Sequence, residues 1–253
     1  MAGRLGGKVC VVTGTGGGMG RATALTFARE GAVVVGCDVA VEPVEETVKL
    51  VRDAGGTMVS LQLCRLSDPA ECARLAGLAV SEFGRIDVLF NLAGRSHFGW
   101  LENVTDQEWD AARRDEVDLI FYLTRTAWPH LMASRGVVVN MASLNGQLSF
   151  KLIPSLSHTT NKAAIIGMTR QLALEGSEHG IRVNSISPGL IESNATREQL
   201  EDQERASGMR SCTLLGRFRQ LEEVANLALF LACDESSYVT GIDVVVDGGM
   251  KVW

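Results

Sequence analysis

The chain has 253 residues, 46% of them hydrophobic, and a formal net charge of −6. This length fits one large α/β domain, and the apolar content supplies an ample core and excludes a disordered chain. The negative charge argues against a nucleic-acid groove, no apolar run approaches the roughly 20 residues of a membrane span, and residues 1–7 contain no apolar signal segment. We therefore expect a cytoplasmic protein that binds neither nucleic acid nor a membrane.

Short runs rich in β-branched residues alternate with helical patterns along the whole chain. We predict strands over Lys8–Thr13, Val33–Cys37, Thr57–Leu63, Ile86–Asn91, Val137–Met141, Ile181–Ile186 and Asp243–Val246. We predict helices near 18–30, 42–54, 69–83, 106–134, 156–178 and 220–233. Because strand–helix–strand crossovers are right-handed, this alternation predicts one Rossmann-like, doubly wound domain over residues 1–253, with a seven-stranded parallel sheet and helices on both faces.

One irregular stretch, near 190–216, is polar and charged and follows Pro188-Gly189. We interpret it as a lid over a substrate. Ligands of doubly wound sheets lie beyond the carboxyl ends of the strands. The residues just after the predicted strand ends should therefore line the site: Thr13, Cys37, Asn91, Met141 and Ile186.

Six cysteines and four histidines are scattered along the chain. They show neither the spacing of metal ligands nor a C-x-x-C pair. We expect buried, reduced thiols and no metal site.

A glycine-rich turn, Thr13-Gly14-Thr15-Gly16-Gly17-Gly18-Met19-Gly20, joins the first predicted strand to the first predicted helix. Without a Cβ, glycine lets a pyrophosphate approach the backbone, and the free amides and positive end of the helix dipole face the anion. An ordinary turn is the alternative, but five glycines in seven positions are costly in backbone entropy. We predict that Gly14, Gly18, Met19 and Gly20 bind the phosphates of a nucleotide.

Asp38 ends the second predicted strand, about twenty residues beyond the glycine turn. A carboxylate there can accept hydrogen bonds from a ribose diol and repel a 2′-phosphate, and Val39-Ala40 offers no cation to bind one. The pattern favours NAD over NADP. The alternative is a helix-capping or surface aspartate.

Together with other segments, these motifs resemble the short-chain dehydrogenase/reductase family over essentially the whole chain. The turn fits its T-G-x3-G-x-G pattern, Asn91-Leu92-Ala93-Gly94 resembles its N-N-A-G, and Ser143 follows the fifth strand as its catalytic serine does. Residues 183–193 and 241–249 resemble its nicotinamide loop and its C-terminal strand and turn.

The resemblance implies a homotetramer that transfers a hydride between the nicotinamide of NAD and a carbonyl or alcohol carbon. It implies cofactor contacts, beyond those already named, from Arg65, Leu66, Asn91, Ala93, Gly94, Lys162, Pro188, Gly189, Ile191 and Ser193. Arg65 stands where the family often has an aspartate that meets adenine.

The catalytic positions depart from the family pattern of a serine, a Tyr-x-x-x-Lys pair and often an asparagine. Lys162 matches the lysine, but the residue four positions earlier is His158, and neither Tyr122 nor Tyr238 lies four residues before a lysine. Glu116 stands where the family has the asparagine, and the interval from Ser143 to His158 is two residues longer than usual. The predicted catalytic set is therefore Ser143, His158, Lys162 and Glu116.

A histidine can take over proton transfer from a tyrosine. Imidazole titrates at about 6.5 and phenol at about 10, so a neutral histidine accepts a proton from an alcohol without help from a cation. This favours oxidation, while a carboxylate at Glu116 would support the imidazolium that reduction requires. We interpret the longer interval before His158 as a shift that compensates for the shorter reach of imidazole.

Alternative roles remain open for three of these residues. His158 could be a polar residue at a helix start in a protein that binds NAD without dehydrogenase activity, or the base of a lyase or isomerase. Glu116 could lie on an exposed helix face near Arg113 and Arg114, or pair with Lys162. Ser143 could be an ordinary loop serine.

Aromatic and aliphatic residues near the predicted strand ends favour an apolar substrate pocket. They are His97-Phe98-Gly99-Trp100, Leu148-Ser149-Phe150 and Met209. Such a pocket fits a hydrophobic or cyclic secondary alcohol, although lone aromatics can equally belong to a core or an interface. Val252-Trp253 and the apolar helix faces fit the implied homotetramer.

Overall fold

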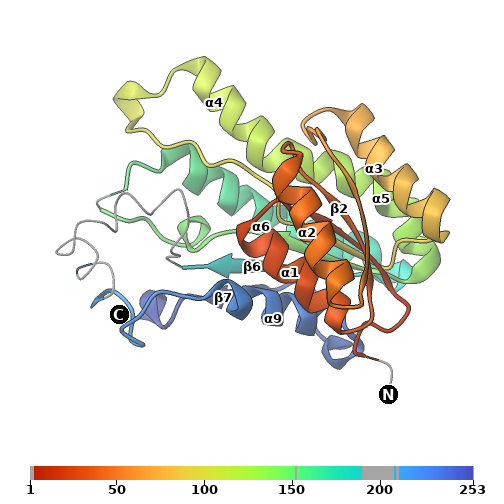
Figure 1. Ribbon diagram of the computed structural model, residues 1–253. Helices are drawn as coiled ribbons and strands as arrows, with labels where there is room; N and C mark the ends of the chain where they lie inside the picture. The colour runs from red at the N-terminus through yellow and green to blue at the C-terminus, as the bar shows by residue number, and fades with distance from the viewer. Residues whose placement is uncertain (1–2, 152, 190–207, 209–210, 253) are drawn as a thin grey trace.

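A seven-stranded parallel sheet forms the centre of the computed structural model, which describes residues 3–151, 153–189, 208 and 211–252 (Figure 1). Neighbouring strands follow the order β3-β2-β1-β4-β5-β6-β7, and each pair runs parallel. The strands are β1 (Val9–Thr13), β2 (Val33–Cys37), β3 (Thr57–Leu61), β4 (Val88–Asn91), β5 (Val137–Met141), β6 (Arg182–Pro188) and β7 (Asp243–Val246). The predicted fold class is confirmed, and each strand boundary falls within two residues of its predicted place.

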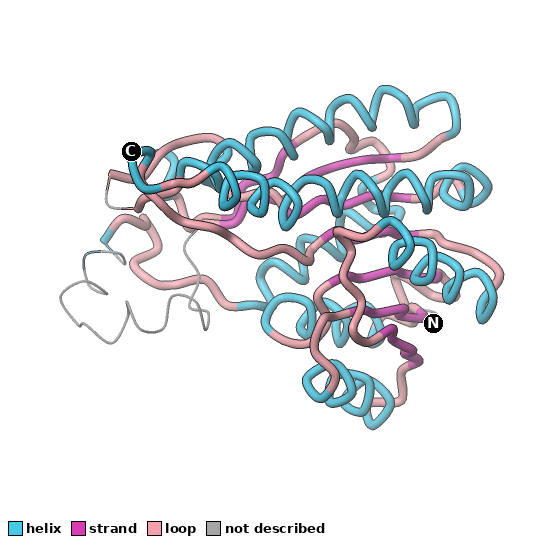
Figure 2. The backbone as a smooth tube through the Cα atoms, turned by 90° about the horizontal axis from the view of Figure 1, so that it is seen from above, coloured by secondary structure: helices cyan, strands magenta, loops and turns pink. Residues whose placement is uncertain are grey.

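Helices cover both sides of this sheet (Figure 2). The helices are α1 (Gly18–Arg29), α2 (Glu42–Asp53), α3 (Pro69–Phe83), α4 (Asp106–Arg113), α5 (Leu119–Ser134), α6 (Leu156–Gly176) and α9 (Leu221–Ala232). Short 3-10 turns occupy Leu101–Asn103 (η1), Leu144–Gly146 (η3), Ser177–His179 (η4), Asp234–Ser236 (η5) and Met250–Val252 (η6). No helix in the described ranges has the length and apolar content needed to cross a bilayer.

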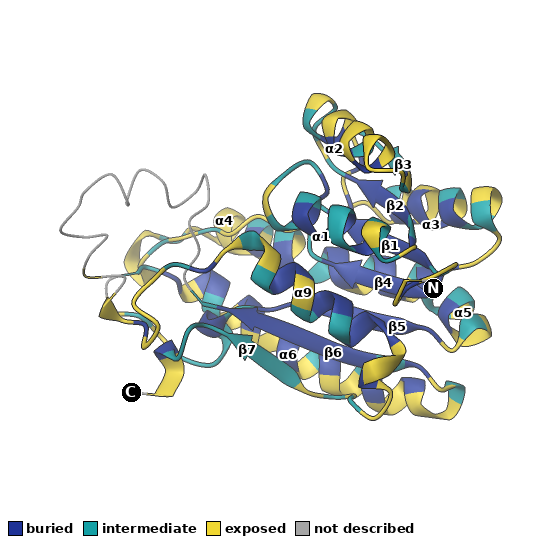
Figure 3. Cartoon of the chain, turned by 60° about the horizontal axis from the view of Figure 1, so that its bottom comes forward, coloured by how far each residue is buried: buried dark blue, intermediate teal, exposed yellow. Residues whose placement is uncertain are grey.

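Most strand residues are buried because each face of the sheet packs against a helical layer (Figure 3). Val9 and Val11 of β1 contribute to one core cluster, with side chains from α3, α5 and α6. Cys10 and Val12 alternate with them and belong to the other cluster, with side chains from α1, α2 and α9. The near-continuous β-branched runs are therefore buried parallel strands.

The prediction of a single helix over 106–134 is wrong in one respect. A π-helical turn over Arg114–Asp118 (η2) separates α4 from α5. A π turn places one more residue in the turn than an α-helix does, and such turns are common at functional sites. Glu116 lies in this turn and is buried. The interruption therefore changes the direction of the acidic side chain that was predicted to belong to the catalytic set.

The expectation of buried thiols is confirmed for five cysteines and wrong for the sixth. Cys10, Cys37, Cys64, Cys72 and Cys233 are buried. Cys212 is exposed, because it lies in the irregular stretch before α9, outside the packed helices and strands. Burial raises the pKa of the Cys72 thiol to about 12, so this group stays protonated at neutral pH.

Candidate active site

The glycine turn lies at the carboxyl end of β1, where the chain crosses between the two halves of the sheet. β1 pairs with β2 on one side and β4 on the other, which makes this the switch point at which doubly wound sheets bind ligands. The hydroxyl oxygen of Thr13 accepts the backbone N–H groups of Leu92 (2.9 Å) and Ala93 (2.8 Å). These bonds hold the turn against the segment that follows β4.

The turn is shaped for close approach of a ligand to its backbone. A Cβ on Gly20 would lie 1.9 Å from the carbonyl oxygen of Gly14, so α1 begins directly against the turn. A Cβ on Gly17 or Gly18 would meet nothing within 4 Å, and no side chain caps the first turn of α1. Unpaired amides at a helix N-terminus beside open space fit the diphosphate of a dinucleotide.

Asp38 closes the turn from the end of β2. Its Oδ2 accepts the backbone N–H of Gly16 (2.8 Å), and its Oδ1 accepts that of Ala40 (3.2 Å). Val41 is the N-cap residue of α2, so Asp38 does not cap that helix. The half-buried carboxylate is instead fixed beside the glycine turn, where a nucleotide ribose would be recognised.

The other residues predicted to contact the cofactor differ in their burial and in their hydrogen-bond partners. Arg65 is exposed, whereas Leu66 is buried in the core and is 5% exposed. The side-chain amide of Asn91 donates to Thr124 (3.0 Å) and to Asn140 (2.9 Å), and its oxygen is buried without a partner. The side chain of Asn91 therefore joins β4 to β5 and α5, and only its backbone faces the turn.

The segments that follow β4 and β6 lie at the same carboxyl edge of the sheet as the glycine turn. Ala93 lies against the turn, because a Cβ on Gly14 would be 3.2 Å from its Cα, and Gly94 is exposed. Pro188 ends β6, and Gly189 donates its N–H to Val246 (2.9 Å). The predicted contacts Ile191 and Ser193, together with Met209, Trp253 and most of the proposed lid near 190–216, lie outside the described residues.

The structure brings three of the four predicted catalytic residues together, namely Glu116, His158 and Lys162. His158 and Lys162 are one turn apart on α6, so their side chains share a face. Nδ1 of His158 lies 2.5 Å from Oε1 of Glu116, and Nζ of Lys162 lies 3.9 Å from the same oxygen. Glu116 is 1% exposed, His158 7% and Lys162 9%. The interpretation of Glu116 as a surface residue is therefore wrong.

Asn161 is a member of this cluster that was not predicted from the sequence. Its side-chain amide donates to Oε2 of Glu116 at 3.0 Å, opposite the bond from His158. Its place three residues after His158 on the same helix was the available signal. Both oxygens of the Glu116 carboxylate are thus held by α6.

Lys162 binds the end of β5, and Ser143 follows that strand. Nζ of Lys162 donates to the carbonyl oxygen of Met141 (3.0 Å). Ser143 follows two residues later, is half-buried, and accepts the backbone N–H of Asn145 at 3.2 Å. A Cβ on Gly146 would lie 2.7 Å from the carbonyl carbon of Lys162, so the turn after Ser143 packs directly on α6. Burial lowers the pKa of the Lys162 ammonium, an effect that the Glu116 charge partly offsets.

Comparison with known proteins gives the family. A family model described as enoyl-(acyl carrier protein) reductase matches residues 14–251. The 3-oxoacyl-[acyl-carrier-protein] reductase FabG of Thermotoga maritima is 37% identical over 250 residues, which cover 98% of this chain and 100% of that protein. The chain belongs to the short-chain dehydrogenase/reductase family. Dehydrogenase/reductase SDR family member 6 of Xenopus laevis is 35% identical over 255 residues, 99% of this chain and 100% of its own.

A solved structure of the family has the same fold. A short-chain dehydrogenase/reductase from Burkholderia xenovorans superposes with a TM-score of 0.94 and is 33% identical, with 100% of this chain and 99% of that chain covered. The predicted family and fold are confirmed, and this short-chain dehydrogenase/reductase is an enzyme of the oxidoreductase class.

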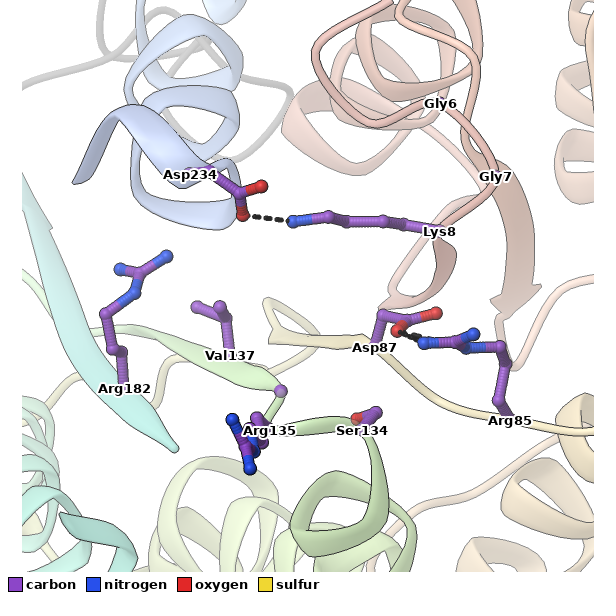
Figure 4. A pocket seen from close by; sticks show the side chains of 11 residues that line it. Gly6, Gly7, Lys8, Arg85, Asp87, Ser134, Arg135, Val137, Arg182 and Asp234 are labelled. Atoms are coloured by element: carbon purple, nitrogen blue, oxygen red, sulfur yellow. Dashed lines mark hydrogen bonds and ion pairs between the residues drawn. The ribbon is translucent and has the colours of Figure 1, made fainter. Parts of the chain in front are cut away.

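A charged hollow lies at the opposite edge of the sheet in this short-chain dehydrogenase/reductase (Figure 4). Its lining comes from residues before or at the start of β1, β4, β5 and β6 and from Asp234 of η5; Lys8 pairs with Asp234 and Arg85 with Asp87, each at 2.6 Å. Ligands of this fold lie at the carboxyl edge, so we do not place the candidate site here.

We expect Gly20→Ala to destabilise the protein, because its Cβ would overlap the carbonyl of Gly14. The free energy of unfolding should fall by about 1–3 kcal/mol, the usual cost of overpacking. Urea denaturation measures this change. The matched control is Gly17→Ala, which meets open space and should stay within about 0.5 kcal/mol of wild type; equal stability of the two variants would contradict the close approach.

Proposed function

We propose that the protein is an NAD(H)-dependent oxidoreductase that transfers a hydride between nicotinamide and a secondary alcohol or ketone, with His158 in place of the family tyrosine. The observation that carries this proposal is the 2.5 Å contact between His158 and the buried carboxylate of Glu116. A carboxylate that holds one nitrogen of an imidazole fixes its tautomer and orientation. This is the arrangement of a working proton acceptor.

The geometry assigns a role to each nitrogen of His158. Nδ1 carries its hydrogen toward Glu116, because an ionised carboxylate only accepts hydrogen bonds. Nε2 is then the basic nitrogen that takes the alcohol proton during oxidation. The negative charge of Glu116 stabilises the imidazolium that results, and the same imidazolium is the proton donor for reduction.

Ser143 and Lys162 supply the remaining groups. We assign the hydroxyl of Ser143 to hold the substrate oxygen, because Ser143 follows β5 at the carboxyl edge and the segment around it packs on α6. Lys162 keeps two of its three hydrogens after the bond to Met141, and these can hold the cofactor ribose. Bound nicotinamide supplies the hydride acceptor or donor.

Asp38 supports the choice of NAD. Its carboxylate is held by two backbone amides beside the glycine turn, so its charge is fixed where a 2′-phosphate of NADP would lie. Like charges at a binding site cost several kcal/mol, which is ample for discrimination.

The surroundings of His158 support an apolar substrate. The ring of Phe98 lies 5.5 Å from the imidazole ring, tilted by 52°, and 56% of Phe98 is exposed. The N–H of Gly99 donates to Pro154 at 2.6 Å, which fixes this segment against the start of α6. Trp100 and Leu101 are also exposed beside it. A hydrophobic or cyclic secondary alcohol fits this wall.

Replacement of His158 by Ala should abolish oxidation of secondary alcohols with NAD, with a loss in kcat of about 100-fold to 10⁴-fold for removal of a general base. NADH binding, measured by fluorescence titration, should stay unchanged, and His158→Tyr should restore part of the turnover. Full turnover in His158→Ala would refute the proposal. NADH binding without turnover in the wild type would indicate a binding protein, and conversion of substrate without a change in NADH would indicate a lyase or isomerase.

We expect Glu116→Gln to lower kcat by about 100-fold or more with little change in NADH affinity, because an amide cannot stabilise the imidazolium. Steady-state kinetics and NADH titration measure the two effects. Glu175→Gln, at the exposed end of α6, is the matched control and should behave as wild type. Equal kcat in the two variants would remove Glu116 from the mechanism.

In Asp38→Asn, the preference for NADH over NADPH should fall by about tenfold or more, because the amide oxygen can still accept from Gly16 while the repelling charge is gone. Dissociation constants of the two cofactors report this ratio. Asp53→Asn, exposed on α2, controls for a general loss of negative charge. An unchanged ratio would mean that another group selects the cofactor.

Phe98→Ala should raise KM for a bulky apolar alcohol by about tenfold, as expected for the loss of one aromatic contact, and leave NADH affinity unchanged. The same change at Tyr238, which is fully exposed, is the control. If KM rises equally for a small alcohol such as 2-propanol, Phe98 supports the loop rather than the substrate.

A further inference from the structure

Arg219 lies beside the glycine turn although 200 residues separate them in sequence. It is located two residues before α9, which packs along α1. Both terminal nitrogens of its guanidinium group are 3.6 Å from the Sδ atom of Met19, the second residue of α1. The cation is therefore located at the N-terminus of α1, whose first turn has no side-chain cap.

Among the residues that the structure describes, no anion pairs with the charge of Arg219. The residue is only 8% exposed, its Nε has no hydrogen-bond partner, and a thioether is a weak acceptor. The nearby acid Glu223 is already held by Arg217, at 2.6 and 2.9 Å, and by the N–H of Gln220 at 2.8 Å. In the part of the chain that the structure describes, no carboxylate forms an ion pair with Arg219.

Burial of the guanidinium group without a partner is unfavourable, and it makes the group more acidic. Burial lowers the pKa of Arg219 to about 10, and the charge of Glu223 offsets the effect only in part. The N-terminus of α1 adds partial positive charge in the same place. An unpaired buried cation beside a positive helix end is unfavourable until an anion binds between them.

We propose that Arg219 binds the diphosphate of the dinucleotide together with the free amides of the first turn of α1. The inference rests on the proposed function, which supplies the ligand. A guanidinium group binds phosphate oxygens through two parallel N–H bonds, and the oxygens would replace the weak contact with Met19. Arg219 then contributes cofactor affinity from a segment far from the glycine motif.

The test compares the affinities of the full chain for NADH, ADP and adenosine by calorimetry. Arg219→Met removes the charge and keeps an apolar stem of similar length. It should weaken the affinities for NADH and ADP by about tenfold to 100-fold, the range for a charged hydrogen bond. The affinity for adenosine, which has no phosphate, should stay unchanged. Arg219→Lys should lie between wild type and Arg219→Met. Arg217→Met is the matched control, because that arginine is exposed and already paired, and its affinities should stay within about twofold of wild type.

Urea denaturation of the protein without cofactor separates binding from structural support. Loss of an unpaired buried cation should leave the free energy of unfolding of Arg219→Met equal or higher. Unchanged affinity for NADH and ADP in folded Arg219→Met overturns the inference, as does equal weakening of adenosine. If the wild type binds ADP but not NADH, the proposed function fails, and the ADP affinities alone decide the role of Arg219. If the wild type binds neither NADH nor ADP, both the proposed function and the role of Arg219 are overturned.

Discussion

A carboxylate buried to 1% exposure must be paired, and Glu116 sets this requirement for the candidate site. α6 meets it with three residues within five positions, since His158 and Asn161 bind the two oxygens and Lys162 adds its charge from 3.9 Å. The position of α6 relative to the π turn is therefore determined by electrostatics as well as by packing. Loss of His158 or Asn161 would leave an oxygen of the buried carboxylate without its partner on α6, and loss of Lys162 would remove the cation near it.

The charges along the carboxyl edge of the sheet alternate in sign. Asp38 is negative at the end of β2, Arg219 and the N-terminus of α1 are positive beside the glycine turn, and Glu116 is negative behind α6. The proposed cofactor has the complementary order: a neutral ribose diol that donates hydrogen bonds, a negative diphosphate, and a nicotinamide that is positive when oxidised. Complementary charge patterns contribute to specificity more than to raw affinity.

The parts of the fold that follow from local chemistry could be predicted from the sequence, and the parts that depend on tertiary pairing could not. Buried strands such as β2 and β5 each begin with three consecutive valines, and the glycine turn has a composition that few other structures require. The π turn over Arg114–Asp118 has no such signal in the sequence, because its residues are ordinary helix formers. The regular helix that was predicted here gave no reason of its own to expect a buried Glu116. Arg219 was missed because its significance depends on Met19, a neighbour only in space.

The π turn has a consequence for how this site can change. An α-helix rotates by about 100° per residue, so loss of one residue within Arg114–Asp118 would restore a regular helix and turn the preceding side chains by that angle relative to α5. A three-nucleotide deletion could thus withdraw the acid from α6 without altering any side chain identity. The length of this one helical segment therefore controls whether a carboxylate at position 116 reaches His158.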